Sequence, residues 1–161
     1  MSELRQDPLN RVKENMLESV RENFIRDGEV VPVAILYYPN GQGEVIATEL
    51  RDEKAKTAFV TFLRKHCRDK QPLAMMLVTE AHMLIVASKE EEERIRGKEI
   101  KDVEGATDVI VCSFETKLTS EVIIMEVMSV GGKNIIVREK RKGTVLSGNF
   151  KDILATPIGL N

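Results

Sequence analysis

Leu73-Ala74-Met75-Met76-Leu77-Val78 is a continuous apolar run, and Thr79-Glu80-Ala81-His82 closes it with a polar patch. Gln71-Pro72 stands just before the run, and the residue preceding a proline disfavours helical backbone, so a helix upstream must end there. A short apolar run between such boundaries predicts a buried strand. Residues 82–86 either extend this strand or form the next one.

Two amphipathic helices are expected upstream of this strand. Asp7-Pro8 is a typical helix start, and Gly28 is a typical end. Asp52 can cap the second helix. Apolar residues recur at three- and four-residue spacing in both segments, which predicts one apolar face on each helix. The positions are Leu9, Val12, Met16, Val20 and Phe24 in the first helix and Ala55, Ala58, Phe59, Phe62, Leu63, His66 and Cys67 in the second.

The remaining apolar segments predict strands in hairpins. Residues 31–38 and 44–48 flank the turn Pro39-Asn40-Gly41-Gln42-Gly43, and Pro32 suggests an edge position for the first of them. Residues 108–114, 121–128 and 134–138 are further strands, and Lys140-Arg141-Lys142-Gly143 is expected to be the turn after the last. The polar insert at 88–94 is either a loop or a short helix, and residues 150–154 form a short apolar patch.

This order of elements predicts a single α+β domain over residues 1–161, with residues 1–7 and 155–161 as loose termini. Hairpins imply antiparallel pairing. We therefore expect a mostly antiparallel sheet of about five to seven strands, with both amphipathic helices packed on one face.

Composition narrows the possible functions. A net charge of −2 and a pI of about 5.8 give no general attraction to a phosphate backbone. The chain has no apolar stretch of membrane-spanning length, and its N-terminus has no apolar signal region, so a cytoplasmic protein is expected. Cys67 and Cys112 have no Cys-x-x-Cys partner and are expected to be buried, reduced thiols.

Two segments carry a resemblance to a known family. Val78-Thr79-Glu80-Ala81-His82-Met83 and Val109-Ile110-Val111-Cys112-Ser113-Phe114-Glu115-Thr116 resemble segments of small bacterial proteins that have no assigned activity. His82 stands where that family has an aromatic residue, usually Trp. The resemblance covers residues 31–128 and implies the order helix, hairpin, helix, strand and long sheet. It implies no chemistry.

Glu80 and His82 are the strongest candidates for a catalytic site. Residues two apart in a strand project to the same face, so the carboxylate could orient the imidazole for acid–base chemistry. The alternative is a pair of hydrogen-bonded or exposed polar residues at a strand end. No third group for nucleophilic catalysis is apparent.

Other candidate sites are weaker. Arg138, Lys140, Arg141 and Lys142 form a basic turn that is either a nucleic-acid contact or a solvated hairpin end. Gly131-Gly132-Lys133 lacks the first glycine and the Ser or Thr of a phosphate-binding loop, and the two histidines lie too far apart for a short metal-binding motif.

The expected function is thus a non-enzymatic binding or assembly module that forms a homodimer and uses no cofactor or metal. A small hydrolase that uses Glu80 and His82 is the first alternative. Nucleic-acid binding through residues 138–142 is the second.

Overall fold

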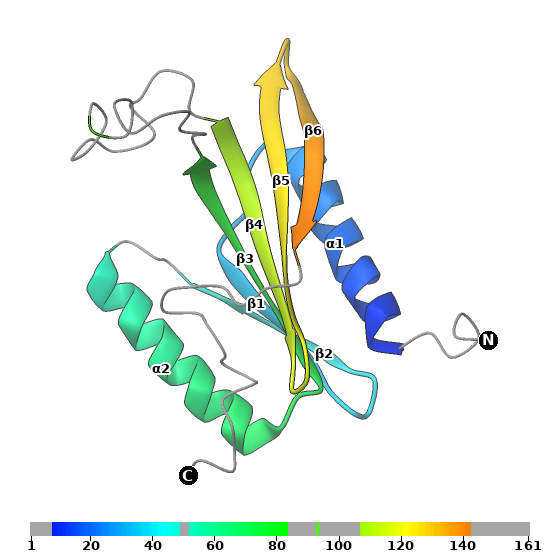
Figure 1. Ribbon diagram of the computed structural model, residues 1–161, viewed down its shortest axis with the longest axis vertical. Coiled ribbons are helices and arrows are strands. Elements are labelled where there is room, and N and C mark those ends of the chain that lie inside the picture. Colours follow the sequence, from blue (N-terminus) through cyan, green and yellow to red (C-terminus); the bar gives the residue numbers. More distant parts are fainter. Residues whose placement is uncertain (1–7, 49–51, 84–92, 94–106, 143–161) are drawn as a thin grey trace.

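A computed structural model describes residues 8–48, 52–83, 93 and 107–142. Two helices and six strands follow one another along these residues (Figure 1). The helices are α1 (Pro8–Asp27) and α2 (Glu53–Lys70). The strands are β1 (Val33–Tyr37), β2 (Gly43–Ala47), β3 (Ala74–Met83), β4 (Thr107–Thr116), β5 (Ser120–Val130) and β6 (Lys133–Lys142).

The predicted helix ends are confirmed where the structure describes them. Asp52 caps α2 by accepting a hydrogen bond of 2.8 Å from the backbone N–H of Ala55. Gln71 ends α2 with left-handed backbone, just before Pro72. Gly28 ends α1 with φ +78°, and a Cβ there would lie only 3.0 Å from the side chain of Asn134. That close approach favours glycine for a second reason besides its backbone angle.

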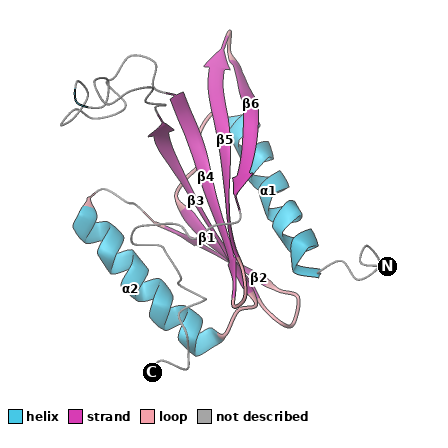
Figure 2. Ribbon diagram, viewed as in Figure 1, coloured by secondary structure: helices cyan, strands magenta, loops and turns pink. Residues whose placement is uncertain are grey.

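All six strands belong to one antiparallel sheet in the order β2-β1-β3-β4-β5-β6 (Figure 2). The predicted α+β class and the predicted number of strands are therefore confirmed. The edges of the sheet are β2 and β6. The edge position predicted from Pro32 is wrong. Pro32 stands just before β1, which pairs with β2 on one side and β3 on the other.

The two helices lie on opposite faces of the sheet, which corrects the expectation that both cover one face (Figure 1). The reason is the composition of β1 and β3, whose alternating residues are apolar on both faces. Val33 and Ile35 pack toward the α1 cluster, whereas Ala34 and Leu36 pack toward α2. Each face therefore has apolar surface that needs its own cover.

Each helix covers a different part of the sheet. The core of α1 is formed with β3, β4 and β5, and its buried residues are Met16, Leu17, Val20 and Phe24. The core of α2 is formed with β1 and β3, and its buried residues are Phe59, Val60, Leu63 and Cys67. Consequently the β1–β2 side of the α1 face lacks a helix directly above it.

One further prediction is wrong, and several others concern residues that the structure does not describe. Residues 138–142 continue β6 and do not form a turn. The apolar patch at 150–154, the termini at 1–7 and 155–161, and the insert at 88–94 apart from Glu93 lie outside the described residues. Among the residues that are described, no helix is long and apolar enough to span a membrane.

Candidate functional site

The first candidate site is a groove between α1 and the β1–β2 hairpin. Its volume is about 560 Å³, within the range of ligand pockets. Apolar side chains dominate the lining, and Met16, Ile35 and Tyr37 contribute to it. Leu36 and seven valines complete the apolar surface, the valines being Val12, Val20, Val30, Val31, Val33, Val45 and Val78.

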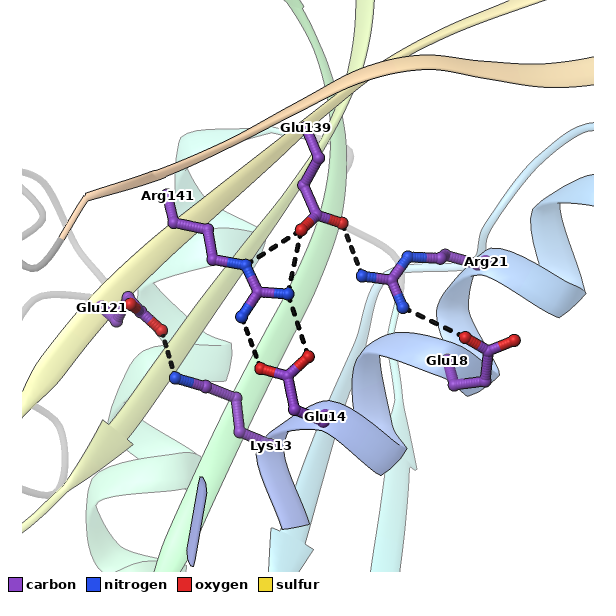
Figure 3. A network of polar contacts seen from close by, with 7 residues as sticks. All are labelled: Lys13, Glu14, Glu18, Arg21, Glu121, Glu139 and Arg141. Atoms are coloured by element: carbon purple, nitrogen blue, oxygen red, sulfur yellow. Dashed lines mark hydrogen bonds and ion pairs between the residues drawn. The ribbon is translucent and has the colours of Figure 1, made fainter. Parts of the chain in front are cut away.

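The position of α1 keeps this groove open. Lys13 Nζ lies 2.6 Å from Glu121 Oε1 on β5, and Arg21 Nη2 lies 2.6 Å from Glu139 Oε1 on β6 (Figure 3). Within the described part of the chain, the ion pairs between α1 and the sheet all run to β5 and β6. They hold the helix toward that side, so that no described helix lies directly above β2 and β1 is only partly covered on this face.

Arg141 and Asn134 extend the same attachment. The Arg141 guanidinium on β6 bridges Glu14 of α1 and Glu139, and its Nη2 lies 2.9 Å from each carboxylate (Figure 3). Near the other end of α1, Asn134 Nδ2 donates a 3.1 Å hydrogen bond to the carbonyl oxygen of Ile25. A helix held at several points along its length makes a fixed wall for the groove.

Polar residues of the groove follow a pattern. Asn15, Ser19 and Asn23 recur every four residues on α1, beside the apolar row of Val12, Met16 and Val20, and so form one rim. Asp27 and Glu29 are the only charged residues in the described lining, and both are acidic, but Asp27 is paired with Arg26 at 3.0 Å. The groove therefore suits an apolar ligand, and it favours a cationic group over an anionic one.

The sequence contains a usable signal for this groove that our prediction did not exploit. Asn15, Ser19 and Asn23 are uncharged in a helix whose other polar positions are mostly charged. They mark a stripe between the buried face and the solvated face. The part of the groove formed by β1 and β2 gives no such signal in the sequence, because the strand order of the sheet determines which strands lie beside β1.

Glu80 and His82 line a different and more polar hollow of about 480 Å³ at the ends of β3, β4 and β5. His82 Nδ1 lies 2.8 Å from Asp108 Oδ1, and the two side chains are 43% and 68% exposed. Glu80 Oε1 accepts a 2.6 Å hydrogen bond from the backbone N–H of Val30. Glu80 thus fastens the α1–β1 connection, whereas His82 and Asp108 form a solvated pair.

Ser129 lines the same hollow, and its hydroxyl is the candidate nucleophile there. Its hydroxyl donates to Asn134 Oδ1 at 2.6 Å, however, so the proton is not directed at His82. The structure therefore brings Glu80, His82, Asp108 and Ser129 around one hollow without aligning a nucleophile and a base.

A cluster that the sequence did not predict joins β2 to α2. Glu44 Oε1 accepts a 2.5 Å hydrogen bond from the Tyr38 hydroxyl and lies 2.9 Å from His66 Nε2. The ring of Phe62 stacks on His66 with centroids 5.3 Å apart. Hydrogen bonds from Tyr38 and His66 lower the pKa of Glu44, while burial and the Glu44 carboxylate raise the pKa of Tyr38. The cluster turns Glu44, the only charged residue of β2, toward the α2 face.

Of the four basic residues predicted as a turn, the two arginines form ion pairs on β6 and the two lysines are exposed. Arg141 is held by Glu14 and Glu139, and Arg138 Nε lies 3.6 Å from Glu126. Lys140 and Lys142 are exposed at alternate positions. Two of the four cations are therefore already matched by carboxylates within the protein.

The remaining candidates are structural. Cys67 and Cys112 are both free and buried, as expected. Burial raises the pKa of each thiol to about 12, with a smaller contribution from Glu115 and Glu44 at Cys67 and from Glu139 at Cys112. Among the described residues, no group of three or more His, Cys, Asp or Glu side chains is arranged to hold a metal ion.

Comparisons of the chain with protein-family models, with curated proteins and with solved structures return no match. Any functional conclusion therefore depends on the geometry of the molecule.

Proposed function

We propose that this protein is a non-enzymatic binding and assembly module, and that the groove between α1 and β1–β2 is its ligand site. The supporting observation is the apolar volume of about 560 Å³ beside a helix that ion pairs hold in place. A ligand that fills it removes apolar surface of both partners from water, and this burial supplies most of the binding free energy.

The groove favours a ligand with an apolar chain and a cationic head. Asp27 and Glu29 lie at one end of the lining. Arg26 donates hydrogen bonds of 3.0 Å to both carboxylate oxygens of Asp27, so Glu29 is the carboxylate that supplies the preference for a cation. An alkylammonium ion should therefore bind more tightly than an alkyl carboxylate of the same chain length.

Displacement of a neutral solvatochromic dye, such as Nile red, tests this proposal. We expect saturable dye binding, with stronger displacement by the alkylammonium ion than by the carboxylate. Val31→Lys should weaken dye binding about tenfold, or about 1.4 kcal/mol, since it adds a charge to the groove where the side chain is 57% exposed.

Val137→Lys is the matched control, because Val137 is 53% exposed but lies on β6, away from the groove. Absence of saturable binding, or equal loss in both variants, would refute the ligand site.

We also propose that the module is a cytoplasmic homodimer. The two free, buried thiols support the location, because disulfides are rare in the cytosol. An open antiparallel sheet with two exposed edges supports self-association. Light scattering coupled to size-exclusion chromatography should give about twice the 18.1 kDa chain mass, and a monomer across the accessible concentrations would contradict the dimer. A bacterial origin is supported only by the resemblance of residues 31–128.

A small hydrolase is the second candidate. It is favoured by one observation, the 2.8 Å approach of His82 Nδ1 to Asp108 Oδ1 in a hollow that Glu80 and Ser129 also line. This arrangement leaves Nε2 of His82 for a substrate or a water molecule. Hydrolysis of an activated ester by the purified protein, lost in His82→Ala, would support the hydrolase. A rate equal to that of buffer would remove it.

A further inference from the structure

The backbone of β2 presents a row of hydrogen-bonding groups to solvent. The Thr48 N–H donates to the Pro32 carbonyl at 3.0 Å, and the Tyr38 N–H donates to the Gln42 carbonyl at 2.9 Å. In an antiparallel pair the bonded positions alternate, so the even-numbered residues of β2 bond to β1. The N–H and C=O groups of Gly43, Val45 and Ala47 consequently point away from the sheet.

The side chains of β2 leave this edge unprotected. Val45 is 67% exposed, and Gly43 and Ala47 are exposed as well. Glu44 could repel a second strand, but Tyr38 and His66 hold its carboxylate on the α2 face. No lysine, arginine or proline occurs within β2.

The opposite edge, β6, is protected. It carries five basic residues along ten positions, and its register with β5 is irregular at Glu126/Val127. Basic side chains and irregular pairing both discourage the addition of another strand. The two edge strands of the sheet thus differ: β6 is protected against pairing with another strand, and β2 is not.

The sequence of β2 is complementary to itself. In an antiparallel pair centred on Val45, Gly43 faces Ala47 of the second copy, and Glu44 faces Ile46. Gly43, Val45 and Ala47, whose backbone groups point away from β1, then form hydrogen-bonded pairs with the same residues of the second copy. No like charges face each other.

We infer that a second copy of this chain pairs with β2 about Val45, which joins the two six-stranded sheets into one. The inference rests on the self-association proposed above and specifies its surface. Directly opposed residues share a face, so both grooves lie on the same side of the joined sheet. The partner's β2 then lies beside β2 in the plane of the sheet and extends the floor of each groove, so that the ligand site is complete only in the dimer.

Disulfide formation tests the centre of this interface. Bonded antiparallel partners have Cα atoms about 5.5 Å apart, a separation that a disulfide spans. Val45→Cys should therefore form a covalent dimer under mild oxidation, whereas Val137→Cys, an exposed position on the opposite edge, should not. The native cysteines are buried and present in both variants.

Two further variants test the edge without cross-linking. Val45→Lys places two cations opposite each other, and Val45→Pro removes an outward N–H but no bond to β1. Both should give the monomer mass in light scattering with an unchanged circular dichroism spectrum, and Val137→Lys should remain dimeric.

The outcomes separate the two proposals. A dimeric wild type that keeps its mass in Val45→Lys, and that does not cross-link through Val45→Cys, overturns the β2 interface and leaves self-association standing. A wild type that is monomeric at every concentration overturns both. Saturable dye binding to such a monomer would still support the ligand site while refuting its completion by a second copy.

Discussion

Arg141 Nη2 lies 2.9 Å from Glu14 Oε1, which joins the last described strand to the first helix across 127 residues of sequence. The same guanidinium contacts Glu139, which in turn contacts Arg21 of α1 (Figure 3). This network and the buried apolar face of α1 together fix where α1 rests on the sheet, and that position leaves a groove beside the helix.

Removal of Arg141 should therefore cost more than an isolated surface ion pair would. We expect Arg141→Ala to lower the free energy of unfolding by about 1–2 kcal/mol, because its forked guanidinium serves two carboxylates. Urea denaturation of Arg141→Ala, Glu14→Ala and the double variant measures the coupling energy, for which we expect about 1 kcal/mol. A coupling energy near zero would show that the pair does not position α1.

Acid should weaken the attachment of α1. The hydrogen bond from Arg141 lowers the pKa of Glu14; burial would raise the pKa of Glu139, but its bonds to Arg21 and Arg141 outweigh burial and lower it. A carboxylate with a lowered folded pKa stabilises the protein above the ordinary pKa of 4.5, and this stabilisation is lost as the pH falls through the folded value.

Melting temperatures recorded from neutral pH down through this window check the effect. We expect Glu14→Gln to have a shallower pH dependence than the wild type, and Glu18→Gln to serve as the control, since Glu18 contacts only Arg21 of its own helix among the described residues. Identical slopes in all three proteins would contradict the assignment.

Tyr38 should ionise at unusually high pH. Burial and the Glu44 carboxylate both disfavour the phenolate and raise the pKa of Tyr38. The chain has two tyrosines, so Tyr37→Phe leaves Tyr38 as the only one. Spectrophotometric titration of that variant should show phenolate absorbance at higher pH than free tyrosine does.

A second substitution in the same background identifies the cause. Glu44→Gln removes the negative charge and should shift the Tyr38 titration toward lower pH. Circular dichroism at each pH separates ionisation from unfolding. A titration that coincides with free tyrosine while the protein is still folded would rule out the Tyr38–Glu44 contact.

The two cysteines should be unreactive in the native protein. Cys67 and Cys112 are 5% and 0% exposed, and burial raises the pKa of each thiol to about 12. Thiolate is the reactive form, so Ellman's reagent should modify neither residue at neutral pH and both after denaturation. Rapid modification of one thiol would show that its part of the core opens readily.

Local patterns in the sequence determined much of this protein. Apolar spacing predicted α1 and α2, Asp52 and Gly28 predicted two of their ends, and the turn at residues 39–43 predicted the first hairpin. These features depend on backbone geometry and on contacts between residues close in sequence, so a linear reading captures them. Glu80 and His82 were also correctly placed on one strand, where they line one hollow.

The tertiary structure alone decided the arrangement of those elements. Consecutive residues of β1 and β3 are apolar, so both faces of these strands can bind a helix. Only tertiary packing places α1 and α2 on opposite faces. Strand order placed β2 at an open edge, and register brought Glu44 to Tyr38 and His66. Such relationships join residues distant in sequence, and burial and charge pairing settle them only when the whole sheet has formed. The groove between α1 and β1–β2 is a consequence of these long-range choices.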